Sequence, residues 1–131
     1  MARTWQNQVD VYVALSEFAR RKFLTGGVPP AKLVVKPHFL YDDPGIGTGQ
    51  GGYALYVGRL SAEKGIGTLL KAWRGGPALP PLRIVGDGPM ADDVRAAAAA
   101  GILEWLGPTA AGDVAELMAN AACVVFPSEC Y

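Results

Sequence analysis

The sequence has no surplus of charge of either sign. Its twelve lysine and arginine residues match its twelve aspartate and glutamate residues, so the formal net charge is +0. Capture of nucleic acid or of an anionic membrane by bulk charge needs a basic excess on one face. The charge balance therefore argues against both kinds of partner, while a local cationic pocket for a small anion stays compatible with it.

Long apolar runs are also missing. No run reaches the roughly 18–20 residues that a membrane span requires, and the first ten residues, "MARTWQNQVD", lack the apolar core of a signal peptide. There are only two cysteines, and a disulfide between Cys123 and Cys130 would have to fold the intervening "VVFPSE" back sharply. We therefore expect a reducing, cytoplasmic location, with Cys123 as a small core residue.

The composition allows a packed core. The chain has 131 residues, of which 50% are hydrophobic and 18% charged, enough for one domain or pieces of two. Residues 42–52, "DDPGIGTGQGG", are rich in glycine and have Ile46 as their one apolar anchor. We therefore expect a first unit at 1–44, a glycine-rich linker at 45–52 and a second unit at 53–131.

Short apolar runs alternate with helical patterns in the second unit. The alternation predicts an α/β fold, a Rossmann-like parallel sheet of four strands with helices on both faces. We expect strands at 53–58, 81–86, 102–107 and 122–128, and helices at 63–74, 90–101 and 112–121. In the first unit we expect strands at 9–15 and 32–39, separated by a helix that Ser16 caps and Gly26 stops.

Two cations flank the first strand-to-helix turn of the second unit, "VGRLSAEKG". Arg59 and Lys64 lie there at the carboxyl end of a strand, which is where open parallel sheets bind ligands. Gly58, Gly86 and Pro127 each end a strand, so the loops that follow should converge on one rim. Two interpretations stay open from these residues alone: a clamp for an anion, or the solvated face of an ordinary turn.

Other patterns predict no nucleotide fingerprint and no metal. "GTGQGG" precedes a strand instead of following one, and "GRLSAEKG" lacks the features of a P-loop. The acidic residues are scattered, and His38, the one histidine, has no partner at ligand spacing. We therefore expect no metal site and no cofactor, and we expect Asp87 to cap a turn.

Three motifs occur in a fixed order: "YVGRLSAEKGIGTLLKAW", "LRIVGDGP" and "LGPTAAGDVAELMANAACVVFPSECY". Together they resemble the retaining, nucleotide-sugar-dependent glycosyltransferases of family 4, which have the GT-B fold. The earlier residues 9–39 resemble the end of that family's amino-terminal, acceptor-side domain. The resemblance implies a fragment from the middle of such an enzyme, inactive by itself. The enzyme would transfer a hexosyl group from a UDP-, GDP- or ADP-sugar to a glycan, lipid or small-molecule acceptor.

The resemblance also assigns roles to residues. Arg59 and Lys64 match the pair that holds the donor diphosphate and stabilises the charge on the leaving group. Gly58 would let the phosphate approach the end of the strand. The remaining matches are the glycine loop beside the nucleotide, Gly86 and Gly88, and the segment that meets the base, Leu106 and Gly107.

The sequence departs from the family pattern at two places. His38 and Phe39 stand where relatives commonly carry asparagine and glycine, and the family's paired glutamates should begin just after Tyr131, so Glu129 is not the first of them. The alternative is a nucleotide- or phosphate-binding module without catalysis. We also expect the open sheet edge to favour self-association, and membrane association of the complete enzyme is left open.

Overall fold

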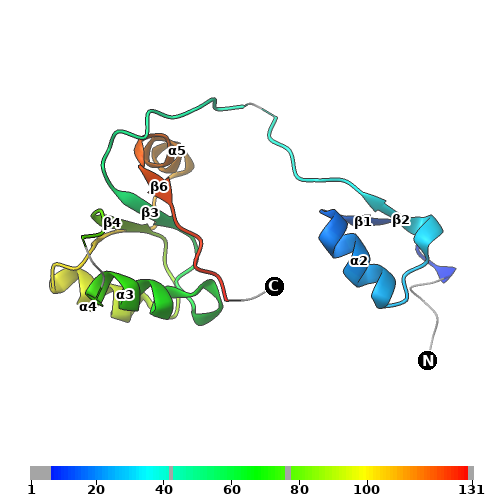
Figure 1. Cartoon of the computed structure of the whole chain (residues 1–131), viewed down its shortest axis with the longest axis horizontal. Helices are drawn as coiled ribbons and strands as arrows, with labels where there is room; N and C mark the ends of the chain where they lie inside the picture. Colours follow the sequence, from blue (N-terminus) through cyan, green and yellow to red (C-terminus); the bar gives the residue numbers. More distant parts are fainter. Residues whose placement is uncertain (1–6, 42, 76–77, 130–131) are drawn as a thin grey trace. The chain divides into compact units, whose positions relative to one another are not determined.

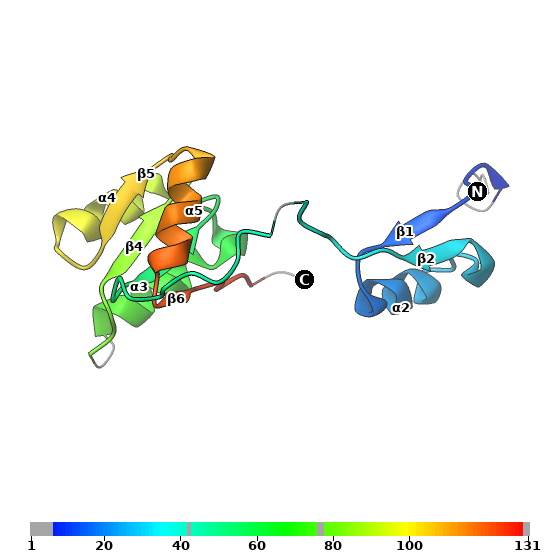
Figure 2. The same cartoon turned by 90° about the horizontal axis from the view of Figure 1, so that it is seen from above.

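The computed structural model describes residues 7–41, 43–75 and 78–129. The chain divides into two compact units, Met1–Pro44 and Gly45–Tyr131, and Figures 1 and 2 show their elements. Each unit is described by itself below.

The first unit is a small βαβ arrangement. Strands β1 (Tyr12–Ala14) and β2 (Leu33–Val35) pair in parallel, and helix α2 (Glu17–Thr25) and a 3₁₀ turn η1 (Pro30–Lys32) connect them. The helix begins as predicted, because the Oγ atom of Ser16 accepts a hydrogen bond of 3.1 Å from the N–H of Ala19. Both strands are shorter than the sequence predicted.

The second unit is the predicted four-stranded parallel sheet. Its strand order is β5-β4-β3-β6, and every pair is parallel. Figure 1 shows α3 and α4 on one side of the sheet and α5 on the other, so the prediction of helices on both faces is confirmed. The elements are β3 (Ala54–Val57), η2 (Ala62–Lys64), α3 (Ile66–Gly75), β4 (Leu82–Val85), α4 (Ala91–Ala99), β5 (Glu104–Gly107), α5 (Ala111–Asn120) and β6 (Cys123–Val124).

Two layers of apolar side chains hold the second unit together. On one face Tyr56 and Ile84 pack with residues of α3 and α4, and on the other Leu55 and Val85 pack against α5. The central strand β3 is therefore buried on both faces, which explains its continuous apolar run. The helical residues that close the two layers are Ile66, Leu69, Leu70, Val94 and Ala97 on the first face and Val114 and Leu117 on the second.

In the second unit, two predicted elements differ clearly from the structure. The helix predicted at 63–74 begins only at Ile66, because Gly65 has a left-handed backbone (φ 71°) that ends the short turn η2 before α3 starts. The strand predicted at 122–128 is reduced to β6, Cys123–Val124. The prediction that Cys123 is a core residue is wrong: its thiol is free and exposed, because β6 is the edge strand of the sheet formed by the described residues.

The glycine-rich residues 45–52 lie against the end of α5. The N–H of Gly49 donates to the carbonyl of Ala119 at 3.1 Å, and the N–H of Gly51 donates to that of Asn120 at 2.7 Å. A Cβ atom on Gly47 would lie 2.1 Å from the Ala119 carbonyl oxygen, so this contact requires glycine. The segment that we expected as a linker is thus packed on the second unit.

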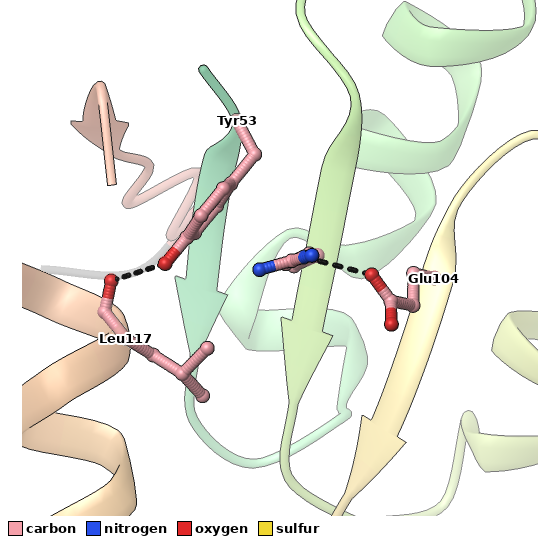
Figure 3. Close-up of polar contacts among 4 residues, drawn as sticks. Tyr53, Glu104 and Leu117 are labelled. Atoms are coloured by element: carbon pink, nitrogen blue, oxygen red, sulfur yellow. Dashed lines mark hydrogen bonds and ion pairs between the residues drawn. The ribbon is translucent and has the colours of Figure 1, made fainter. Parts of the chain in front are cut away.

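The amino end of the sheet is joined by polar contacts that Figure 3 shows in close-up. The hydroxyl of Tyr53 donates to the carbonyl of Leu117 in α5 at 2.7 Å. The guanidinium of Arg83 lies over the Tyr53 ring, 4.2 Å from its centroid, and its Nε atom pairs with Glu104 at 2.7 Å. These contacts connect β3, β4, β5 and α5.

Candidate functional site

The loops after β3, β4 and β5 meet at the carboxyl edge of the sheet. The sequence predicted this for the loops after Gly58 and Gly86, but not for the end of β5 at Gly107. The N–H of Gly58 donates to the carbonyl of Val85 at 3.0 Å, and the N–H of Gly86 donates to that of Gly107 at 2.9 Å. These contacts join the three loops through backbone atoms, so the side chains of the loops are not needed to hold the rim together.

Leu60 anchors the first of these loops on the second. Its side chain is fully buried, its N–H donates to the carbonyl of Asp87 at 2.9 Å, and its own carbonyl accepts from Met90 at 2.9 Å. The carboxylate of Asp87 accepts a hydrogen bond of 2.8 Å from the N–H of Gly88. Asp87 therefore caps its own turn, as expected.

The glycines of the rim are required by the approach of one loop to the other. A Cβ atom on Gly86 (φ 130°) would lie 1.9 Å from the carbonyl oxygen of Gly58, and one on Gly88 would lie 2.5 Å from that of Leu60. A Cβ atom on Gly58 would face the hydroxyl of Tyr56 at 3.0 Å. The structure thus gives these glycines a packing reason that sequence reasoning did not find.

Arg59 and Lys64 lie on the loop between β3 and α3. Both side chains are exposed. The carbonyl of Arg59 accepts a hydrogen bond of 2.8 Å from the hydroxyl of Tyr56, and the N–H of Lys64 donates to the carbonyl of Ser61 at 3.2 Å. Within the described residues neither cation takes part in an ion pair. Their backbone is held while their charges stay available to a ligand.

Glu63 is a third charged group of this loop that sequence reasoning missed. Its carboxylate accepts a hydrogen bond of 2.6 Å from the hydroxyl of Ser61, a buried polar residue. This bond, its own backbone N–H and the charges of Arg59 and Lys64 lower the pKa of Glu63. Burial, and secondarily the Glu63 charge, raise the pKa of Tyr56. The signal was present in the motif, where an acid separates the two cations.

The segment predicted to meet the base contains an irregularity in β5. Trp105 pairs with Ile84 and Gly107 with Val85, so Leu106 is an extra residue without a partner in β4. Leu106 is exposed, and the indole N–H of Trp105 donates to the carbonyl of Gly86 at 3.1 Å. The end of β5 is therefore tied directly to the glycine loop.

A fourth segment, residues 125–129 after β6, reaches the same rim. A Cβ atom on Gly65 would lie 1.9 Å from the carbonyl oxygen of Pro127. The N–H of Glu129 donates to the carbonyl of Glu63 at 3.0 Å, and its carboxylate accepts from the hydroxyl of Thr68 in the first turn of α3. The sequence placed Pro127 at the rim correctly, but it did not predict the contacts of Glu129.

Residues 51–131 match the family profile described as "Glycosyl transferases group 1". The chain belongs to this family. Its α/β fold with parallel sheets and flanking helices matches that of GT-B glycosyltransferase structures. The comparison with curated proteins finds no match.

Three solved structures illustrate the likeness of fold. The lipopolysaccharide outer core galactosyltransferase WaaB is 22% identical, with a TM-score of 0.70 over 91% of this chain and 37% of its own. Anabaena HepE in complex with UDP is 21% identical; its TM-score is 0.69, and the match covers 91% of this chain and 38% of HepE. TarM of S. aureus, in complex with fondaparinux, alpha-GlcNAc-glycerol and UDP, is 16% identical. Its TM-score is 0.74, and the match covers 93% of this chain and 26% of TarM. The chain spans 26–38% of the length of these proteins.

A further feature of this group 1 glycosyltransferase chain lies in the second unit, at the opposite end of the sheet from the rim. A cavity of about 490 Å³ opens at the amino end of the sheet, beside Tyr53 and Arg83, and acidic residues of α5 contribute to its lining. His38 is an exposed residue of the first unit. Among the described residues no three His, Cys, Asp or Glu side chains form a group able to hold a metal ion. No helix in the same part of the chain is long and apolar enough to cross a membrane.

Proposed function

We propose that this chain carries the donor-diphosphate site of a retaining family 4 glycosyltransferase. The observation that carries the proposal is the loop between β3 and α3, whose backbone is anchored while Arg59 and Lys64 stay exposed and outside the described ion pairs. Two cations on a fixed loop at the carboxyl edge of a parallel sheet suit a diphosphate. HepE and TarM were solved with UDP, which supports a nucleotide-sugar donor, and the glycan ligands of TarM support a carbohydrate acceptor.

In the proposed reaction, the anomeric carbon of the donor sugar exchanges its bond to a diphosphate oxygen for a bond to an acceptor oxygen, which loses its proton. Negative charge builds on the departing nucleoside diphosphate. The guanidinium of Arg59 would fork two phosphate oxygens, and the ammonium of Lys64 would add a point charge. Because the leaving group carries more charge in the transition state than in the ground state, these contacts would lower the barrier.

The other predicted site residues would complete the donor pocket. Gly58, Gly86 and Gly88 would let the loops pack closely enough to bring their backbone to the phosphates, and Leu106 and Gly107 would meet the base. In this proposal the two cations neutralise the diphosphate without a metal or cofactor. The donor is a UDP-, GDP- or ADP-hexose, the enzyme acts in the cytoplasm, and the 131-residue chain binds the nucleotide without turning it over.

The test is calorimetric titration of the chain with UDP, GDP, ADP and inorganic pyrophosphate. Charge-assisted contacts are worth roughly 1.5–3 kcal/mol each, so Arg59→Ala and Lys64→Ala should each weaken binding about tenfold or more. The matched controls are Arg74→Ala and Lys71→Ala, exposed cations further along α3, which should leave the affinity unchanged. Equal affinities in all four variants would show that the loop is an ordinary solvated turn and not a diphosphate site.

The complete enzyme distinguishes catalysis from simple binding. There kcat should fall further than the donor affinity in Arg59→Ala and Lys64→Ala, because both cations act most strongly on the transition state. A complete protein that binds the nucleotide but transfers no sugar would instead support the non-catalytic module.

A further inference from the structure

Residues 127–129, which follow β6, contact the loop that carries Lys64. The carbonyl oxygen of Pro127 lies where a side chain on Gly65 would be, at 1.9 Å from the position of a Cβ atom. Gly65 is buried, and its backbone is left-handed with φ 71°. The segment after β6 is therefore in direct backbone contact with the residue that follows Lys64.

Glu129 closes this contact with two hydrogen bonds. Its N–H donates to the carbonyl of Glu63 at 3.0 Å, and its carboxylate accepts from the Thr68 hydroxyl. One bond reaches the residue before Lys64, and the other reaches the first turn of α3. Figure 1 allows the reader to follow the segment as it leaves β6 and passes the start of α3.

We propose that Glu129 is a positioning residue for Lys64 in the donor-diphosphate site. The proposal rests on the function proposed above. Lys64 ends a turn of three residues, Ala62–Lys64, and its own side chain is exposed, so that side chain cannot fix the turn. Within the loop, the hydroxyl of Ser61 donates to the carboxylate of Glu63. From the segment after β6, the N–H of Glu129 donates to the carbonyl of the same residue.

The physical reason is preorganisation. A cation on a mobile loop must be ordered when the diphosphate binds, and this ordering reduces the affinity. A turn that is already fixed by residues 127–129 avoids that cost. The Thr68 hydrogen bond therefore acts on the diphosphate through Lys64, and neither Thr68 nor Glu129 needs to touch the ligand.

The experiment is a double-mutant cycle on the 131-residue chain, with inorganic pyrophosphate as the probe and calorimetry as the readout. Thr68→Val removes only the donor of the bond and keeps the shape of the side chain. Glu129→Gln keeps an acceptor oxygen and removes the charge, and Glu129→Ala removes both. Each variant is also made in the Lys64→Ala background. The matched control is Thr25→Val, which removes an exposed hydroxyl bonded to a carbonyl in the first unit.

We expect Thr68→Val and Glu129→Ala to weaken pyrophosphate binding about threefold to tenfold, the scale of one hydrogen bond. Glu129→Gln and Thr25→Val should bind as the unchanged chain does. In the Lys64→Ala background the effect of Thr68→Val should disappear, because the residue through which it acts is gone. A merely structural role would give the same loss with and without Lys64.

The outcomes separate the two proposals. If Lys64→Ala weakens binding but Thr68→Val and Glu129→Ala do not, the positioning role is wrong and the diphosphate site stands. The positioning role is also wrong if the losses of pyrophosphate affinity from Thr68→Val and Lys64→Ala add in the double variant. It is wrong as well if Glu129→Gln binds pyrophosphate as weakly as Glu129→Ala. If Lys64→Ala itself binds pyrophosphate unchanged, the proposed function is wrong. Thermal melts of every variant report whether the fold is kept.

Discussion

Gly86 and Gly58 approach each other so closely that a methyl group on Gly86 would lie 1.9 Å from the carbonyl oxygen of Gly58. Backbone therefore packs on backbone between the loops that follow β3 and β4. Side chains at these positions would separate the loops and move the backbone on which Arg59 lies. The glycine motif near the rim is thus a packing device, whatever ligand the rim binds.

Gly86→Ala should destabilise the second unit by about 2–4 kcal/mol, because it combines a clash with a backbone at φ 130° that alanine rarely adopts. Gly112→Ala is the control: it lies in α5 with nothing within 4 Å of the added Cβ atom. That change should stabilise the chain by about 0.5–1 kcal/mol. Urea denaturation measures both, and a Gly86→Ala variant as stable as the original chain would contradict the close approach.

Tyr56→Phe and Tyr53→Phe form a matched pair at opposite ends of β3. Each removes one hydrogen bond to a backbone carbonyl, of 2.8 Å to Arg59 and 2.7 Å to Leu117. Each should cost about 0.5–1.5 kcal/mol of unfolding free energy. Only Tyr56→Phe should also weaken pyrophosphate binding, because it alone releases the backbone of Arg59. Equal pyrophosphate affinities in the two variants would show that this anchor does not affect the site.

Glu63 should make the stability depend on pH in the acidic range. Its pKa is lowered below the ordinary value of 4.5, first by the Ser61 hydrogen bond. A carboxylate with a lowered folded-state pKa stabilises the fold above its unfolded-state pKa, and this contribution is lost as the pH falls through the folded-state pKa. The stability difference between the original chain and Glu63→Gln should therefore be constant near neutral pH and shrink below about pH 4.5. Urea denaturation at a series of pH values measures the difference; one that stays constant into the acid range would contradict the lowered pKa.

Cys123 should react with a thiol reagent in the folded chain, since its side chain is exposed. The measurement is the rate of Ellman's reaction in a Cys130→Ser variant, so that only Cys123 contributes. The rate should approach that of the same variant unfolded in urea. Protection by several orders of magnitude in the absence of urea would restore the original expectation of a buried thiol.

The order of the elements, the parallel sheet and the family resemblance could all be predicted from local sequence patterns. Alternating strand and helix signals are local, and the helix start at Ser16 depends on one side chain and the next turn. The carboxyl-edge rule then placed Arg59 and Lys64 on a shared rim without any knowledge of packing.

The contacts that fix this rim could not be predicted from local patterns, because they join distant segments of the chain. The exposure of Cys123 depends on its place at the sheet edge, and the close approach of Pro127 to Gly65 joins two segments that are distant in the sequence. The contact of Glu129 with Thr68 joins residues 61 positions apart, so no local pattern could reveal it. The physical reason is the same in each case: burial and hydrogen bonding between distant segments are set by how the loops pack in space.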